Sequence, residues 1–289
     1  MDRLTYKTKY GQVVFGCGPY MFSELDGVNS PEVTRQTESV IDSDGQFIVQ
    51  TYYPSKTITI NGYIKTENRT ELNALKRQLV CMCDCKTDGL LYYEKGNRTY
   101  FTEVIPNSFP EFGDEIQHMT AFSVSLNAYR IYWKKSTETA DYVYKRFKNV
   151  QTTFTLPCVF TVRKNKNSFT NYGDLPCEFI CSITGISDSE DVSAQTLSNG
   201  SQTGFALINS STGEKLVINH DIAIGETVTV DTANFAITSS VSGNLLHKLQ
   251  RDCEFFKLAP GESEIEVINY NLGRNIVARF SFNETYVGV

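Results

Sequence analysis

Histidine is scarce in this sequence, which has three in 289 residues. Few side chains are therefore available for acid–base catalysis near neutral pH or for holding zinc. A GxSxG elbow and a cysteine in a catalytic context are also missing. His220 and Asp221 come closest to an acid–base pair, but neighbours on a strand point to opposite faces. We expect neither enzymatic activity nor a cofactor, although a glycosidase depends on carboxylate spacing in the fold, and no pattern here selects a pair.

Basic charge and long apolar runs are lacking too. The chain has 27 Lys and Arg against 33 Asp and Glu, and its net charge of −6 argues against a partner held through nucleic-acid phosphates. The acidic excess is shared by the segments before and after Trp133, so neither is a basic domain. No apolar run reaches the ~20 residues of a membrane span. The N-terminal MDRLTYKTKYGQ is charged where a signal peptide is apolar, so we expect synthesis in a cytosol, no export and no membrane partner.

The eight cysteines are interpreted as free thiols, because no secretory route is indicated. The segment CMCDC (residues 81–85) invites a zinc reading. On a helix, however, Cys81 and Cys85 share the polar side while Cys83 joins the apolar stripe, so one face offers only two ligands. Zinc would need a histidine or a distant cysteine as well. We expect a packed helix end with two partly exposed thiols, which leaves sensitivity to oxidation open.

Two acidic segments resemble fragments of calcium loops. DSDG (residues 42–45) lacks the later acidic ligand and the flanking helices of an EF-hand, so it is interpreted as a tight turn. SDSED (residues 187–191) precedes a run rich in Ser, Asn and Gly and is interpreted as a solvated loop, with calcium as the alternative. We predict no metal site.

Most of the sequence has the two-residue period of half-buried strands. In TITINGYI (residues 57–64), Ile58, Ile60 and Ile64 share one face. In IVARFSF (residues 276–282), Ile276 begins an alternating row that ends at Phe282. Both patterns predict strands with one face toward a core.

One segment has a helical period instead. Its apolar positions recur at spacings of three and four between residues 67 and 85, and they are Leu72, Leu75, Leu79, Met82 and Cys83. Thr66 or Asn68 is placed to cap its start, and Asp88-Gly89 follows its end. An amphipathic helix in a β-rich chain must cover a sheet, so the first part of the chain is predicted to be α+β.

The chain is long enough for two hydrophobic cores. We predict an N-terminal β domain with one helix over residues 1–133, a charged connector over residues 134–150, and a β-sandwich over residues 151–289. Trp133 is predicted to be a core residue at the end of the first domain. Closely spaced glycine turns in the last segment favour the sandwich.

The stretch FFKLAPGESEIEV (residues 255–267) has the composition of either a ligand-gripping loop or a strand connection. Pro260 restricts φ and Gly261 permits a positive φ, so a type II turn over residues 259–262 is predicted. Ile265 and Val267 would then face the core, while Glu264 faces water.

The second part of the chain carries several turn and strand motifs in order. They are NYGDLPCEFICSITG (171–185), ALINSSTGEKLVI (206–218), IGETVTVDT (224–232), SGNLL (242–246), RDCEFFKLAPGESEIEV (251–267) and a final YVGV. The first part has SELDGVNSP (23–31), DSDGQ (42–46), SKTITINGYI (55–64) and DGLLYYEKGNRTYF (88–101). Together these motifs resemble the distal tail proteins of siphophages and their prophages. The marker residues are Asn171, Gly173, Asp174, Pro176, Asn209, Gly213, Gly225, Asp231, Gly243, Asn244, Phe256, Leu258, Pro260 and Gly261.

The resemblance implies a structural virion protein, a homohexameric hub ring at the tail tip. The N-terminal domain would form the ring and continue the tail-tube channel, through which DNA passes without specific binding. A galectin-like or carbohydrate-module-like sandwich would project outwards. The implied partners are other copies of the chain, the tail tube protein, a tail-associated tip protein and receptor-binding or baseplate proteins, with synthesis and assembly in the host cytoplasm.

A carbohydrate-binding protein that recognises a bacterial surface glycan is the alternative function. It requires an exposed strip of Tyr or Phe side chains beside carboxylates or amides on the sandwich. The chain departs here from those members of the resembled family that bind saccharides through a large insertion, because it has no such insertion, and this argues against direct sugar recognition.

Overall fold

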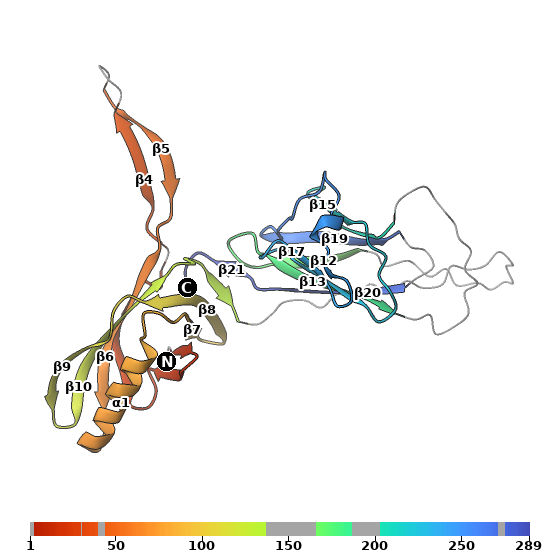
Figure 1. Cartoon of the computed structure of the whole chain (residues 1–289). Coiled ribbons are helices and arrows are strands. Elements are labelled where there is room, and N and C mark those ends of the chain that lie inside the picture. The colour runs from red at the N-terminus through yellow and green to blue at the C-terminus, as the bar shows by residue number, and fades with distance from the viewer. Residues whose placement is uncertain (1–2, 30, 40–43, 137–165, 187–202, 271–274) are drawn as a thin grey trace, which may run out of the picture. The chain divides into compact units, whose positions relative to one another are not determined.

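The computed structural model describes residues 3–29, 31–39, 44–136, 166–186, 203–270 and 275–289. The chain divides into two compact units (Figure 1). Unit 1 comprises Met1–Thr137 and Thr285–Val289, and unit 2 comprises Glu138–Glu284. Within the described ranges, no helix has the length and apolar character needed to cross a membrane.

Unit 1 is built on one antiparallel sheet. Its strands are β1 (Arg3–Thr8), β2 (Gly11–Phe15), β3 (Tyr20–Asp26), β6 (Lys56–Lys65), β7 (Gly89–Lys95), β8 (Arg98–Pro106), β9 (Glu111–Ile116), β10 (Met119–Ala128), β11 (Trp133–Lys135) and β21 (Thr285–Tyr286). The main order is β2-β1-β7-β8-β10-β6-β3, with β9 paired to β10 and β11 paired to both β8 and β21.

Strand β6 shows how the sequence pattern becomes packing. Ile58, Ile60 and Ile64 are fully buried, as the alternation predicted. The strand pairs along its whole length with β10 and on its other edge with β3. Because both edges and one face are covered, β6 is a central element of the unit 1 core.

Helix α1 (Arg69–Met82) covers part of this core and is shorter than the predicted span of residues 67–85. Asn68 caps its start, since its side chain accepts a hydrogen bond from the Glu71 amide at 2.8 Å. The helix ends one residue before Cys83, because the Asp84 carboxylate accepts bonds from the Lys86 amide and the Thr87 hydroxyl and so turns the chain. In the predicted stripe, four residues are buried and Leu75 is partly buried.

Two strands of unit 1 form a separate sheet. β4 (Thr34–Ser39) and β5 (Gln46–Tyr52) pair only with each other, and Figure 1 shows this hairpin extending away from the main sheet. It joins β3 to β6 along the chain. We call it the hairpin below.

The structure differs from the sequence expectation at the end of the chain. We placed everything after residue 150 in the sandwich, but Thr285 pairs with Lys134 and Tyr286 with Trp133. The rings of Tyr100 and Tyr286 lie 5.2 Å apart edge to face, which accounts for the return of this segment to unit 1. Residues 137–165, which include most of the predicted connector, lie outside the described residues.

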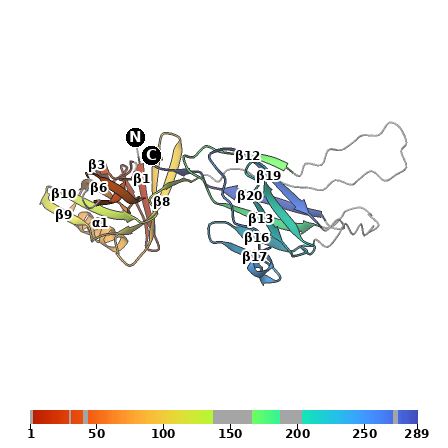
Figure 2. The same ribbon diagram turned by 90° about the horizontal axis from the view of Figure 1, so that it is seen from above.

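Unit 2 contains two antiparallel sheets (Figure 2). One has the order β12-β19-β14-β15 and the other β18-β17-β16-β13-β20. The strands are β12 (Lys166–Asn171), β13 (Phe179–Ile186), β14 (Phe205–Asn209), β15 (Lys215–Ile218), β16 (Thr227–Asp231), β17 (Ala236–Ser239), β18 (Gly243–Asn244), β19 (Gly261–Asn269) and β20 (Asn275–Phe282). A 3-10 turn, η1 (Leu246–Lys248), is the short helical element among the described residues of unit 2.

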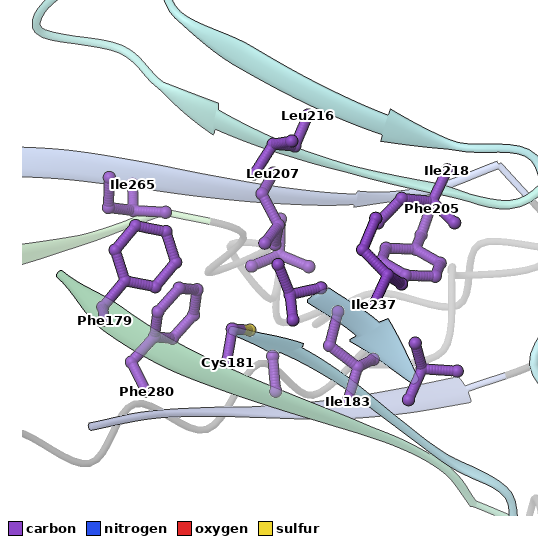
Figure 3. Close-up of a cluster of buried hydrophobic side chains, with 14 of the residues drawn as sticks. Phe179, Cys181, Ile183, Phe205, Leu207, Leu216, Ile218, Ile237, Ile265 and Phe280 are labelled. Carbon is purple, nitrogen blue, oxygen red and sulfur yellow. The ribbon is translucent and has the colours of Figure 1, made fainter. Parts of the chain in front are cut away.

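The two sheets share one core. Phe179, Cys181 and Ile183 of β13 point toward Phe205 and Leu207 of the opposite sheet (Figure 3). The predicted row on β20 is buried as well, from Ile276 to Phe282. The mainly β fold with one helix is therefore confirmed, while a galectin-like arrangement stays a prediction.

The segment 255–267 forms a bend that leads into β19. Phe256 and Leu258 lie in the core, and Phe255 is partly buried against it. Gly261 has φ of +93° but already begins β19, so the structure has a bend at Pro260 where a closed turn was predicted. Asn171 opposite Gly261 extends the pairing of β12 with β19 to this point, which draws the glycine into the strand.

Candidate functional site

The described part of the chain contains no cluster of three or more histidine, cysteine or acidic side chains suited to a metal. Cys83 is buried, whereas Cys81 and Cys85 are exposed, and all three are free thiols. This matches the packed helix end expected from the sequence. Of the DSDG segment only Asp44 and Gly45 are described, and SDSED lies outside the described residues.

Sequence reasoning missed one buried acid–histidine contact. His220 Nε2 lies 2.8 Å from Glu226 Oε1, and Ser239 donates its hydroxyl hydrogen to the same oxygen. Ala223 donates its amide hydrogen to Oε2 at 2.7 Å. Burial raises the pKa of the Glu226 carboxyl, but these hydrogen bonds outweigh burial and hold the pKa below its usual value.

The hydrogen bonds among His220, Glu226 and Ser239 connect two loops and do not have the order of a catalytic triad. The carboxylate lies between Ser239 and His220, whereas a triad places the histidine between the serine and the acid. Ser239 Oγ also accepts amide hydrogen bonds from Val241 and Ser242, both at 3.0 Å. Glu226 therefore stabilises the turn after β17 and the connection before β16.

An open groove of about 410 Å³ lies on unit 1. Lys7, Lys9, Asp88 and Glu103 contribute charges of both signs to its walls. Glu103 is already bound by the Tyr129 hydroxyl at 2.9 Å, and this hydroxyl is itself part of the lining. Tyr129 and Glu103 thus satisfy one another within the groove, and Arg130 Nε lies 3.3 Å from the same Glu103 carboxylate oxygen.

The hairpin exposes a run of apolar side chains. Phe47, Ile48 and Val49 are consecutive, and their side chains are 50%, 57% and 52% exposed. Consecutive apolar residues on a strand occupy both of its faces. Val49 falls at a register shift, because Thr37 pairs with Ile48 while the preceding Gln36 pairs with Gln50. Both faces therefore present apolar side chains to solvent.

The backbone of the hairpin is open as well. Neither β4 nor β5 has a second neighbour among the described strands, so each has a free edge. An isolated two-stranded hairpin is marginally stable in water, and free apolar edges favour pairing with another chain. A contiguous apolar surface of this kind is typical of a protein–protein contact.

A buried polar contact lies where the hairpin joins the main sheet. The carbonyl oxygen of Val28 accepts a hydrogen bond from Trp133 Nε1 at 3.1 Å, and the Val289 amide lies 3.5 Å from it. Lys56 Nζ lies 2.9 Å from the Asn29 oxygen and 3.5 Å from the Val28 oxygen. We call Val28, Asn29, Lys56, Trp133 and Val289 the Val28 junction.

Lys56 is an unusual member of this junction. Its side chain is 9% exposed, and its Nζ lies 5.4 Å from the centre of the Trp133 ring. Burial lowers the pKa of the Lys56 ammonium to about 8. The aromatic face and two carbonyl oxygens replace the water that the ammonium loses.

The outward face of β6 and β10 has a different character from the hairpin. Three cross-strand pairs follow one another along it, and they are Thr57 with Asn127, Thr59 with Ser125, and Asn61 with Ser123. All six side chains are uncharged and polar, and each is short. The row itself is uncharged, but exposed carboxylates flank it on the same face, because Glu24 and Asp26 of β3 pair with Asn61 and Thr59.

The predicted marker residues lie at turns and in the core of unit 2. Asn171 is buried and donates to the carbonyl oxygens of Leu175 at 2.9 Å and Leu258 at 3.0 Å. Its side-chain oxygen accepts from the Gly173 amide at 2.9 Å. Asn171 thus ties the loop before β13 to the bend before β19. Asp174 and Pro176 are exposed in that loop.

The remaining markers form other connections. Asp231 Oδ1 accepts the amide hydrogens of Ala233 and Asn234. Asn209 is buried, accepts from the Ser211 amide and leaves its Nδ2 without a hydrogen-bond partner. Gly213, Gly225 and Gly243 have positive φ, and Asn244 accepts from the Leu246 amide. These markers all lie in turns and connections between strands. Within the described residues they do not gather at one site.

The exposed aromatic rings in the described part of unit 2 are Tyr172 and Phe235. Tyr172 follows β12, and Phe235 lies between β16 and β17 with φ of +52°. They therefore belong to different connections. Phe235 contacts Phe255 edge to face, with ring centres 5.5 Å apart.

Comparison with known proteins gives matches in both parts of the chain. Residues 15–128 match the family model described as phage tail protein RIFT-related domain, and residues 189–286 match that of the siphovirus-type tail component, C-terminal domain. No curated protein sequence matches the chain.

Solved structures with the same fold are similar over nearly the whole chain. The crystal structure of the SPP1 Dit protein, described as a paradigm of the hub adsorption apparatus of phages that infect Gram-positive bacteria, has a TM-score of 0.67 at 11% identity and covers 98% of both chains. Two structures of the phage p2 baseplate in its activated conformation, with Ca and with Sr, have TM-scores of 0.56 and 0.55 at 10% identity, each covering 100% of both chains.

Proposed function

Since this chain belongs to the distal tail protein family of siphophages, we propose that it forms a homohexameric hub ring at the tip of the virion tail. It is a structural protein of a phage tail. Its fold matches that of a protein described as a hub adsorption apparatus and those of two baseplate structures, which supports a role in joining tail components. The family is structural, and we infer that the chain has no catalytic role.

The uncovered hairpin is the observation that carries the ring proposal. A monomer would leave Phe47, Ile48 and Val49 in water together with two free strand edges. In a ring, a neighbouring copy of the chain would cover the hairpin of every subunit. Cyclic symmetry requires two different complementary patches on each subunit, and the hairpin serves as one of them.

We infer that the uncharged strip on β6 and β10 faces the channel of this ring. DNA is a dense polyanion, so fixed positive charge on the wall would retain it and negative charge would repel it. Short side chains such as Thr59 and Ser125 do neither. The carboxylates of Glu24 and Asp26 beside the strip repel DNA, so this face suits a wall past which DNA slides without specific binding.

Unit 2 is proposed to be the outward sandwich domain, with unit 1 as the ring. Its marker residues stabilise turns such as that of Asn171, which fits a scaffold on which other proteins dock. The tail tube protein would contact one side of the ring and a tail-associated tip protein the other. Receptor-binding or baseplate proteins would attach around it, after synthesis and assembly in the host cytoplasm.

The test is the mass of the purified protein across a range of concentrations, by light scattering and electron microscopy. We expect wild type to form hexamers and Ile48→Ser to shift the population toward the 32.6 kDa monomer. Val241→Ser is the matched control, because Val241 is also exposed but lies in unit 2. A wild type that stays monomeric at every concentration, or rings that form equally well in Ile48→Ser, would contradict the proposal.

Recognition of a surface glycan by unit 2 stays a hypothesis. It predicts binding of the purified chain on an array of bacterial glycans. The exposed rings of Tyr172 and Phe235 are the described aromatic groups that a sugar would contact. Loss of glycan binding in Phe235→Ala would favour this function, and an array without signal would exclude it for the glycans tested.

A further inference from the structure

The two chain segments that carry the hairpin meet the main sheet at the Val28 junction. The first leaves the sheet after β3, through Val28 and Asn29, and the second returns to it at Lys56, the first residue of β6. The 2.9 Å contact of Lys56 Nζ with the Asn29 oxygen therefore links the outgoing segment to the returning one. This contact closes the base of the hairpin.

The same junction reaches the two segments of unit 1 that continue into unit 2. Trp133, which donates to the Val28 oxygen, begins β11, and its strand partner Tyr286 belongs to β21. Trp133 is fully buried, and its ring lies under the Lys56 ammonium. Trp133 thus links the base of the hairpin to β11 and β21, the two strands through which the chain leaves unit 1 and returns to it.

A lysine is a costly residue at this place. Among the described residues, no carboxylate lies within ion-pair distance of Lys56 Nζ, so its charge is offset by two carbonyl oxygens and an aromatic ring. Replacing a buried charged group by an apolar one of similar size is often neutral or stabilising. The stability of unit 1 therefore does not explain why a lysine is present here. A lysine is explained if the segments that leave for the hairpin and return from it must be held together.

We propose that Lys56 is a positioning residue that fixes the direction in which the hairpin leaves unit 1, so that it meets its partner in the ring. The inference rests on the proposed ring, in which the hairpin is the contact. Lys56 itself touches no partner and acts through Asn29 and Val28. Trp133 of β11 donates a hydrogen bond to the Val28 carbonyl oxygen and so stabilises the same segment.

The experiment uses four full-length proteins, which are wild type, Lys56→Met, Lys56→Arg and Lys65→Met. Methionine has about the length and the apolar stem of Lys56 but lacks its charge and its hydrogen-bond donors. Arginine keeps the positive charge and has hydrogen-bond donors. Lys65 is the matched control, because it is exposed at the other end of β6. Hydrogen exchange of peptides over residues 27–39 and 46–57, thermal unfolding, Trp133 fluorescence and ring affinity are measured for each protein.

We expect Lys56→Met to raise exchange in these two peptides by about tenfold, because a hydrogen bond to a charged donor is lost, and to weaken ring affinity by a similar factor. The melting temperature should stay unchanged or rise, and the emission of Trp133, the single tryptophan, should shift as the cation leaves its ring. Lys56→Arg should restore most of the protection and affinity, and Lys65→Met should match wild type.

Two outcomes overturn the inference. One is unchanged exchange of the hairpin peptides in Lys56→Met. The other is exchange that rises over the whole of unit 1 together with a lower melting temperature, which indicates a merely structural residue. Exchange is measured on dilute monomer and does not depend on ring assembly. If wild type never forms rings, the proposed function is contradicted, but the exchange data still test the role of Lys56 at the hairpin base.

Discussion

Strands β5 and β6 are close neighbours in the chain and have opposite surroundings. In β6, Ile58 and Ile60 alternate with polar residues and are fully buried, whereas in β5 the apolar Phe47 and Ile48 are adjacent and exposed. Alternation suits a strand with one face on a core. A continuous apolar run suits a strand covered on both faces. The single chain covers the first and leaves the second open, which is why we assign β5 to an interface between copies.

The largest expected effect comes from truncating one isoleucine in each strand. Ile60→Ala should lower the free energy of unfolding of unit 1 by about 2–5 kcal/mol, because it removes buried carbons and leaves a cavity. Ile48→Ala should change the stability of the monomer by less than about 0.5 kcal/mol, as for other exposed sites. Chemical denaturation of dilute protein measures both. Equal losses in the two variants would show that the hairpin packs within its own chain.

A pH titration tests Lys56, the first residue of β6, at the base of the hairpin. Burial lowers the pKa of Lys56 to about 8 from 10.5, so between these values the unfolded chain binds a proton that the folded chain has released. Stability from this group is therefore fully present above pH 10.5 and is lost as the pH falls through about 8. The melting temperature of wild type should rise by a few degrees relative to Lys56→Met between these pH values.

Lys56→Met serves as the reference in that experiment because other tyrosine and cysteine groups titrate in the same range and are common to both proteins. Parallel profiles of the two proteins would contradict a shifted Lys56 pKa. They would leave the hydrogen bonds of the Val28 junction as the sole role of this side chain.

The smallest expected effect lies in unit 2, which contains neither β5 nor β6. Gly261 has φ of +93°, and a Cβ there would meet no atom within 4 Å, so the cost of a side chain is backbone strain alone. Gly261→Ala should lower the free energy of unfolding of unit 2 by roughly 1 kcal/mol and leave ring assembly unchanged. Glu262→Ala, at the next and exposed residue, is the control. Loss of assembly in Gly261→Ala would place the ring contact in unit 2.

Local patterns predicted much of the fold. The alternation in residues 57–64 and 276–282 identified the buried faces of β6 and β20, because burial on one face of a strand imposes a two-residue period. The apolar stripe of the helix was equally clear, and its ends were misplaced by two to three residues because Asn68 and Asp84 decide them through side-chain hydrogen bonds.

Contacts between distant residues could not be read in the same way. Trp133 Nε1 bonds a carbonyl 105 residues earlier in the chain, and no local period encodes that contact. His220 was set aside because of its neighbour Asp221, while its partner Glu226 lies six residues away across a connection. The run Phe47-Ile48-Val49 was visible in the sequence, but its exposure follows only from the absence of a third strand beside the hairpin among the described elements.

Hydrogen exchange across β5, at concentrations below and above ring assembly, tests most directly whether the hairpin forms the contact between subunits. We expect the amides of residues 46–52 to become strongly protected when rings form, while those of α1, already protected by the core, stay unchanged. Rings that form while residues 46–52 exchange as fast as in the monomer would contradict the assignment of the hairpin to the interface.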